Sequence, residues 1–410
     1  MDGLLMAWEG DFSWKSILAN MAREVTGPVG DAQVYMVVDD QSEKNTCNTT
    51  LTNAGVDMSE VFYVVRPTDT IWIRDYGPRY IYQGGCRAIV DHTYNRPRPL
   101  DDAFPSHFSN LRQHPLYDNG LIHGGGNFHL DSIERSYATR LINNENQGLT
   151  EAQIIARWFA FQNVNTTLFN PFPQNIDSTQ HLDMWMQIIA DNKVVISDWP
   201  TAQGSTQDQI CERAASLMAQ RGYTVYRTPA LSISSHFTYT NAVMCNDLVM
   251  IPKYSQQGMS SYNAQALATW ESAMPDKDIV QIDATNIISA AGALHCIVMH
   301  VPKNLNGAQP GVYLIGPQGG SPEFLLPGQQ VEIEWLADDD SAVTAIDLWM
   351  DAPFGSTRPV PIIRNTTNDG TFIWTVPSAS TLRRFKLRVD AKDAQGNTAT
   401  SYSSGTFRIQ

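Results

Sequence analysis

The sequence predicts an α/β protein followed by a smaller all-β domain. Up to about Gly319, short β-branched runs alternate with segments that repeat apolar residues every three or four positions. From about Ser321 onward, alternating strands remain, separated by turns rich in Gly, Pro, Asp and Asn. A chain of 410 residues is also long enough for two domains.

Strands are expected in the first part wherever β-branched and aromatic residues gather. The chain opens almost directly on a strand, and further strands are expected over 32–40, 61–67, 87–95, 193–200, 223–229, 248–254 and 278–285. Helices are expected over 12–25, 149–162, 207–222 and 262–274. This alternation favours repeated α/β units over one doubly wound sheet, although periodicity alone leaves both open.

The second part is typical of a small β-sandwich. Its predicted strands are 329–337, 342–350, 370–377 and 383–393, and the segment Ile315–Pro322 is the expected linker. We therefore place one domain at residues 1–318 and the sandwich at residues 319–410.

The net charge and the composition indicate which kinds of substrate and which cellular locations are compatible with this protein. The net charge of −14 argues against nucleic-acid binding and favours a cationic substrate. No apolar run reaches the length of a membrane helix. The low charged fraction of 17% suits a secreted or cell-surface protein, although the opening MDGLLMAWEG lacks the features of a signal peptide. We expect that signal to be missing from this sequence.

The five cysteines have no spacing typical of a zinc cluster. Cys47–Cys86 or Cys211–Cys245 could pair in an oxidising compartment, and the odd count leaves at least one thiol free. Cys296 is the thiol of interest, because the segment around it reads as a strand that enters a tight turn beside His295. We expect no metal and no cofactor.

Residues suited to catalysis gather in a few short stretches. They are Trp72, Arg74 and Asp75 in IWIRDYGPRY, Arg96 and Arg98 in YNRPRP, the glycines of HGGGNFHLD, His181 and Asp183 in STQHLDMWMQ, Asn241 in YTNAVM, and His295 and Cys296 in LHC. Alone, each has a structural interpretation: Cys296 as a small buried hydrophobe, for example, or Arg74 and Asp75 as one end of an ion pair. His181 and Asp183 would share a face if their segment is extended.

Together, these residue types suit displacement at a guanidinium carbon. Two carboxylates can each accept a bidentate pair of hydrogen bonds from this planar cation. A thiolate attacks such a poor electrophile better than water does. A histidine can then protonate the departing ammonia and activate water. A serine hydrolase fits less well, since no G-x-S-x-G elbow is present.

The motifs WIRDYGP, GGGN, HLDMW and LHC, in this order, resemble those of the Porphyromonas-type peptidylarginine deiminases. This family belongs to the guanidine-modifying superfamily, together with the agmatine deiminases. The resemblance covers about residues 5–318. It implies a pentein-type propeller of five α/β blades, followed by an immunoglobulin-like sandwich.

The resemblance also implies roles for individual residues. Cys296 would be the nucleophile and His181 the general acid and base. Asp75 and Asp183 would clamp the guanidinium, Trp72 would cover its face, and Asn241 would line the pocket. Arg96 and Arg98 would hold the terminal carboxylate of a substrate. The sequence departs from the family at Ala290 and Ala291, where glycines are usual, and it lacks the arginine that many agmatine deiminases carry after the aspartate.

The predicted activity is hydrolysis of peptide or protein arginine, at the C-terminal position, to citrulline and ammonia through a covalent thiouronium. The main alternative is an agmatine or free-arginine deiminase. An amidinotransferase uses the same intermediate, and a non-catalytic secreted binding protein is the alternative from another class. Arginine-containing peptides or proteins are the expected partners, and the oligomeric state is left open.

Overall fold

The computed structural model describes residues 1–352, 358–378 and 384–410, which divide into two compact units. The first unit comprises Met1–Arg79, Val90–Ser106 and Tyr117–Val301. The second comprises Tyr80–Ile89, His107–Leu116 and Pro302–Gln410. The boundary at residue 318 stays a prediction.

Residues 1–301, described without a gap, form five sheets of three or four strands, ordered β18–β1–β2–β3, β4–β5–β6, β7–β8–β9, β10–β11–β12 and β15–β16–β17. Their strands are β1 (Gly3–Ala7), β2 (Gln33–Val38), β3 (Val61–Val65), β4 (Arg79–Gln83), β5 (Cys86–Tyr94), β6 (Leu116–His123), β7 (His129–Leu130), β8 (Arg135–Thr139), β9 (Asn165–Phe169), β10 (Met186–Ala190), β11 (Lys193–Asp198), β12 (Thr224–Pro229), β15 (Val243–Cys245), β16 (Leu248–Lys253), β17 (Asp278–Asp283) and β18 (Met299–Val301). A two-stranded sheet joins β13 (Leu231–Ser232) and β14 (His236–Phe237).

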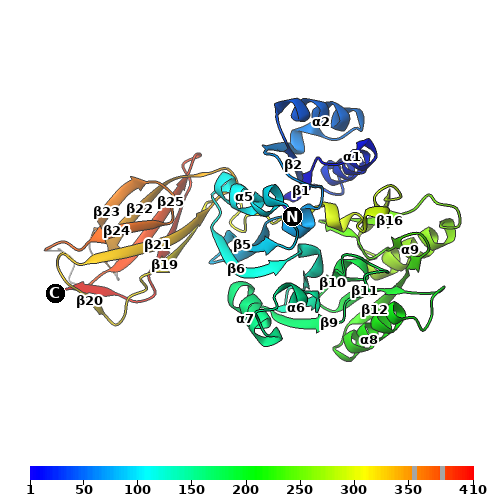
Figure 1. The fold of residues 1–410 in the computed structure, drawn as a ribbon. Helices are drawn as coiled ribbons and strands as arrows, with labels where there is room; N and C mark the ends of the chain where they lie inside the picture. Colours follow the sequence, from blue (N-terminus) through cyan, green and yellow to red (C-terminus); the bar gives the residue numbers. More distant parts are fainter. Residues whose placement is uncertain (353–357, 379–383) are drawn as a thin grey trace. The chain divides into compact units, whose positions relative to one another are not determined.

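Three of these sheets repeat one pattern, an antiparallel pair followed by a parallel pair. Each parallel pair is joined through a helix, as a parallel crossover requires: α7 (Glu151–Gln162), α8 (Thr206–Gln220) and α9 (Ser260–Ala273). Helix α1 (Phe12–Thr26) joins β1 to β2 in the same way. Figure 1 shows these helices at the outer edge of the unit. The α/β class and its repeated units are therefore confirmed, and the five-bladed count stays a prediction.

The predicted helices and strands of both parts correspond to observed elements within a few residues, although residue 383 of the last predicted strand lies outside the described residues. Helix α2 (Gln41–Asn53) was not predicted, because it buries only Cys47 and Leu51 and so lacks an apolar stripe. The expected strand at Cys296 was wrong. The segment is the 3₁₀ turn η5 (His295–Ile297), which precedes β18. No helix among the described residues is long and apolar enough to span a membrane.

The second unit contains two larger sheets, β19–β21–β24 and β23–β22–β25–β26, and the pair β20–β27. Their strands are β19 (Gly311–Gly316), β20 (Glu323–Leu325), β21 (Gln330–Asp338), β22 (Val343–Asp351), β23 (Val360–Thr366), β24 (Thr371–Thr375), β25 (Lys386–Asp393), β26 (Thr398–Tyr402) and β27 (Phe407–Ile409). Val331, Ile333 and Trp335 of β21 alternate with exposed residues and enter one apolar core. The immunoglobulin-like assignment stays a prediction.

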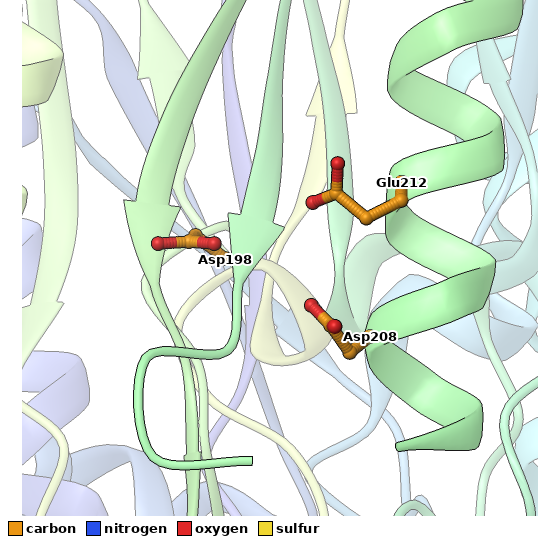
Figure 2. A group of neighbouring side chains, drawn as sticks. All are labelled: Asp198, Asp208 and Glu212. Atoms are coloured by element: carbon orange, nitrogen blue, oxygen red, sulfur yellow. The ribbon is translucent and has the colours of Figure 1, made fainter. Parts of the chain in front are cut away.

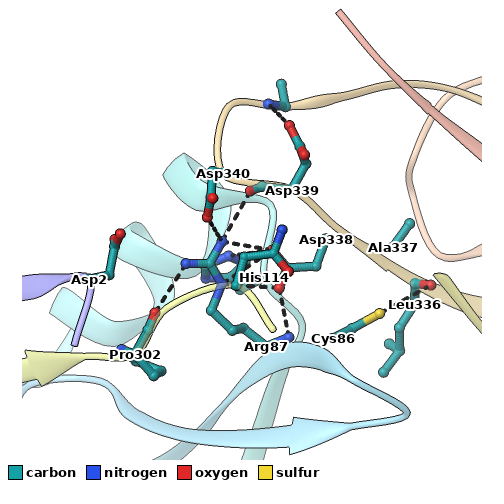
Figure 3. Close-up of polar contacts among 12 residues, drawn as sticks. Asp2, Cys86, Arg87, His114, Pro302, Leu336, Ala337, Asp338, Asp339 and Asp340 are labelled. Carbon is teal, nitrogen blue, oxygen red and sulfur yellow. Dashed lines mark hydrogen bonds and ion pairs between the residues drawn. The ribbon is translucent and has the colours of Figure 1, made fainter. Parts of the chain in front are cut away.

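A buried ion-pair cluster lies in this second unit (Figure 3). Arg87 on β5 donates from Nε to Asp338 Oδ2 at 3.0 Å and from Nη2 to Asp338 Oδ1 at 3.0 Å. His114 Nε2 lies 3.2 Å from Asp338 Oδ1. Burial alone would raise the pKa of Asp338, but the hydrogen bonds from His114 and Arg87 outweigh it and lower that pKa to about 2.

Replacing Asp338 with asparagine should destabilise the protein by about 3–5 kcal/mol, because the buried Arg87 loses its buried carboxylate, while the carboxylate of Asp340, at 3.2 Å, is exposed. Chemical unfolding followed by circular dichroism measures this change. Asp369→Asn, at an exposed position of the same unit, is the control and should stay within about 0.5 kcal/mol of the wild type. Equal effects of the two substitutions would contradict a special role for this cluster.

Candidate active site

A cavity of about 340 Å³ in the first unit brings most of the predicted site residues together. Its lining consists of Trp72, Asp75, Tyr94, Arg96, Arg98, Ser178, Thr179, His181, Ala290, Ala291 and Cys296. The other two predicted residues, Asp183 and Asn241, are fully buried and contact Cys296 directly. All eight residues to which the resemblance assigned a role therefore lie at this one site.

The glycine-rich run holds the two aspartates and the histidine close to one backbone. Gly126 N donates to Asp75 Oδ1 at 3.0 Å. A Cβ atom on Gly126 would lie 2.8 Å from His181 Nδ1, 3.0 Å from Asp183 Oδ2 and 3.0 Å from Asp75 Oδ1. The three side chains therefore converge on a position that only glycine can occupy.

Gly126→Ala should lower kcat by about a hundredfold or more, because its methyl group would displace these three side chains by several tenths of an ångström. Gly148→Ala is the matched control, since nothing lies within 4 Å of its added Cβ. Ammonia release and thermal unfolding, measured on both variants, separate a catalytic loss from misfolding. Wild-type turnover by Gly126→Ala would contradict this geometry.

His181 and Asp183 belong to a 3₁₀ turn, η3 (Leu182–Met184), with His181 at its N-cap, so the segment is not extended. His181 Nδ1 lies 3.4 Å from Asp75 Oδ1. Burial alone would lower the pKa of His181, but the carboxylates of Asp75 and Asp183 outweigh it and raise that pKa above its ordinary value. A histidine in this state can supply a proton to a leaving group.

Cys296 lies in η5, buried beside one amide and one carboxylate. Asn241 Nδ2 donates to Cys296 Sγ at 3.2 Å, and the thiol donates to Asp183 Oδ2 at 3.5 Å. Burial raises the pKa of Cys296 well above its usual value, and the charges of Asp183 and Asp75 raise it further. A cation bound between the two carboxylates would reverse the second effect, because it neutralises the charges that disfavour the thiolate.

His295 has a structural role that the sequence did not reveal. Its Nδ1 donates to Asp183 Oδ2 at 2.7 Å, and its ring stacks on His129 with centroids 5.2 Å apart. Burial lowers the pKa of His295 well below its ordinary value, so it acts as a neutral donor. The His-Cys pair in the sequence was the one available signal, since the contact with Asp183 joins residues 112 positions apart.

Glu145 was not predicted from the sequence at all. Asn95 Nδ2 donates to Glu145 Oε1. This carboxylate interacts electrostatically with His181 and Arg96, which line the cavity. Burial raises the pKa of Glu145, and the charges of His181 and Arg96 oppose that rise. No motif marks Glu145, because it comes from the short helix α6 (Leu141–Glu145).

The two arginines of YNRPRP differ in how they are held. Arg98 Nη1 donates to Tyr94 Oη at 3.0 Å and to Thr70 Oγ1 at 3.4 Å. Arg96 is exposed at the cavity mouth. Trp72 also lines this cavity, and its ring packs edge-on against Trp14 at 5.8 Å.

The two alanines that replace family glycines lie in this cavity wall. Ala291 adopts φ = 62°, a left-handed conformation that costs a non-glycine residue about 1–2 kcal/mol. A Cβ on the next residue, Gly292, would lie 2.4 Å from the Trp72 ring. The turn therefore accepts a methyl group at 291 and excludes one at 292.

The cysteines and one group of acidic residues bear on whether the protein forms disulfides or holds a cation. All five cysteines are described and buried and none is in a disulfide, so neither considered disulfide is formed. Among the described residues, one acidic group, Asp198, Asp208 and Glu212, is close enough to hold a cation (Figure 2). Arg227 Nη2 lies 2.7 Å from Glu212 Oε1 and 3.7 Å from Asp198 Oδ1, so a guanidinium already balances this group.

Repeated α/β sheets around a buried cysteine, a histidine and two carboxylates define a hydrolase of the guanidine-modifying class, which acts on the C–N bonds of guanidino groups. More narrowly, the chain belongs to the Porphyromonas-type peptidyl-arginine deiminase family, whose model matches residues 2–302.

Relatives and solved structures agree with this class. A Legionella pneumophila (strain Paris) protein named "Putative agmatine deiminase" is 24% identical over 260 residues, which cover 58% of this chain and 74% of that protein. The agmatine deiminase of Enterococcus faecalis has a TM-score of 0.63 at 19% identity, covering 74% of this chain and 94% of that one. A structure from Porphyromonas gingivalis, named a "Putative Arginine Deiminase", has a TM-score of 0.63 at 18% identity, with coverages of 74% and 96%. Likeness at these identities establishes the shared fold.

Proposed function

We propose that this protein deiminates the C-terminal arginine of peptides or proteins to citrulline, with release of ammonia. One observation carries the proposal: Arg96 and Arg98 line the same cavity as Cys296, Asp75 and His181. A substrate with a guanidinium at one end and a carboxylate at the other matches this arrangement of charges.

In the proposed reaction, Asp75 and Asp183 bind the guanidinium, and Trp72 covers its face. The bound cation lowers the pKa of Cys296, whose thiolate attacks the guanidinium carbon. His181 donates a proton to the departing ammonia, which leaves a covalent thiouronium. His181 then accepts a proton from water as the water attacks this carbon, and citrulline and the free thiol are released. Asn241 Nδ2, which donates a hydrogen bond to Cys296 Sγ at 3.2 Å, would hold the sulfur in place during both steps.

We also propose that residues 1–318 form a five-bladed catalytic propeller and residues 319–410 an immunoglobulin-like sandwich. The five small sheets before residue 302 support the first assignment. The two larger sheets of the second unit support the second. Secretion or a cell-surface location remains part of this proposal.

The deciding experiment compares three substrates: a peptide that ends in arginine, the same peptide amidated, and agmatine. Ammonia and citrulline are measured for the peptides, and ammonia with carbamoylputrescine for agmatine. Turnover of the free-acid peptide alone supports the proposal. Preference for agmatine supports the second candidate, an agmatine deiminase, which the names of the relatives favour. Equal turnover of both peptides contradicts the carboxylate role of the arginines.

Arg96→Ala should raise KM for the free-acid peptide by about tenfold or more, because a charged hydrogen bond to the carboxylate is lost. Its kcat and its activity on agmatine should change little. Arg213→Ala is the control, since Arg213 is an exposed arginine of α8 outside this cavity. An unchanged KM in Arg96→Ala would show that Arg96 does not bind the substrate carboxylate.

A further inference from the structure

Arg74 is a buried cation hydrogen-bonded to the backbone of His295, the residue before Cys296. It precedes Asp75 in the short helix α3 (Ile73–Tyr76) and is 8% exposed. Its Nε donates to the carbonyl oxygen of His295 at 3.2 Å, and its Nη1 donates to Met299 Sδ at 3.2 Å. Its Nη2 lies 2.8 Å from His300 Nδ1.

All three acceptors of this guanidinium are neutral. A carbonyl and a thioether carry no charge. His300 Nε2 donates to the carbonyl oxygen of Met244 at 2.9 Å, so His300 Nδ1 is free to accept from Arg74. Burial lowers the pKa of His300 well below its ordinary value, and Arg74 lowers it further. The sequence left open that Arg74 and Asp75 form one end of an ion pair. Asp75 Oδ1 lies 3.4 Å from His181 Nδ1, whereas the three hydrogen bonds of Arg74 described above all go to neutral groups.

Neutral partners do not cancel the positive charge of a guanidinium. Its electrostatic effect on nearby ionisable groups is therefore retained, and this effect is strong in a buried site. Burial lowers the pKa of Arg74 to about 10, while Asp183, Cys296 and Asp75 oppose that change. Arg74 therefore stays charged near neutral pH. Its charge interacts electrostatically with Asp183, Cys296 and Asp75.

We propose that Arg74 is an electrostatic positioning residue, whose fixed positive charge favours the thiolate of Cys296 and the ionised forms of Asp75 and Asp183 before substrate binds. The inference rests on the proposed function in taking Cys296 as the nucleophile. The bound substrate supplies a second positive charge, and Arg74 acts while the site is still empty. The hydrogen bond from Arg74 to His295, the partner of Asp183, fixes the position of this charge.

Other charged groups also act on the thiol and enter any measured pH profile. The titratable or charged groups around Cys296 and its carboxylate neighbours are Asp75, Asp183, His181, His129, His295, Glu145, Asp177 and Arg96. The carboxylates disfavour the thiolate, and His181 opposes them only while it is protonated. Arg74 differs from the histidines because it is charged throughout the working pH range, and from Arg96 because it is buried.

The test measures alkylation of Cys296 by uncharged iodoacetamide as a function of pH, with no substrate present. Because the thiolate is the reacting form, the rate at a fixed pH reports its population. Peptide mass spectrometry identifies the alkylated cysteine. We expect Arg74→Gln, which keeps a donor but loses the charge, to react about tenfold more slowly at pH 8 and to shift the profile to higher pH by about one unit.

Two further variants separate charge from structure. Arg74→Lys keeps the charge but not the fork of donors, so its profile should stay within about threefold of the wild type. Arg79→Gln is the matched control. Arg79 is also buried and has neutral partners, His123 Nε2 at 3.3 Å and the Phe128 ring at 4.0 Å, but it does not contact His295. Its profile should match that of the wild type.

An unchanged profile in Arg74→Gln overturns the proposal, as does an equal shift in Arg79→Gln. If Arg74→Gln does not fold, Arg74→Lys decides: a preserved profile supports the role of the charge, and a shift of about one unit overturns it. Alkylation needs no turnover, so failure of all three substrates would count against the proposed function alone.

Discussion

Cys296→Ser should abolish deimination, with a loss of about ten-thousandfold or more in kcat. A serine hydroxyl in this buried site stays protonated, because burial and the charges of Asp183 and Asp75 already disfavour an anion there. The hydrogen bond from Asn241 can still form to oxygen, so the fold should be retained. Ammonia release measures the loss, and thermal unfolding checks the fold.

The matched control for this variant is Cys211→Ser, which changes a buried free thiol in helix α8, in a different core cluster from Cys296. It should keep wild-type kcat even where it costs some stability. If Cys296→Ser retained turnover within tenfold of the wild type, Cys296 would not be the nucleophile, and the covalent course of the reaction would have to be abandoned.

Asp183→Asn should lower kcat/KM by about a thousandfold, the second-largest effect that the site predicts. Asp183 Oδ2 accepts from His295 at 2.7 Å and from Cys296 at 3.5 Å, while Oδ1 is buried with no hydrogen-bond partner among the described residues and can accept from a substrate. Removing one partner of a buried ionic contact costs about 3–5 kcal/mol. The substitution removes one of the two charges proposed to bind the guanidinium.

The control for this variant is Asp131→Asn, another buried carboxylate, which pairs with Arg135 outside the cavity. It should lower the unfolding temperature and leave KM for arginine substrates unchanged. The KM of each variant, measured with the free-acid peptide, separates the two effects. A normal KM and kcat in Asp183→Asn would contradict the proposed carboxylate clamp.

Local sequence patterns were sufficient to predict much of the fold. Apolar residues at helical spacing predicted α1, α7, α8 and α9, and β-branched runs predicted β2, β11 and β16. The same patterns did not predict α2, which buries few apolar side chains, or the 3₁₀ turns that carry Asp183 and Cys296. Such short turns depend on contacts made by distant residues, as the bond from His295 N to Asn241 Oδ1 illustrates.

The class of enzyme, one that acts on guanidino groups, could be predicted from the sequence alone, because a cysteine, a histidine and two aspartates in specific motifs suit that kind of substrate. Only the tertiary structure placed those motifs around one cavity, since they lie on segments from Trp72 to Cys296. It also revealed the neutral surroundings of Arg74 and the bond from His295 to Asp183. Electrostatic interactions depend on distance and burial in space, and neither quantity is encoded in the local spacing of residues.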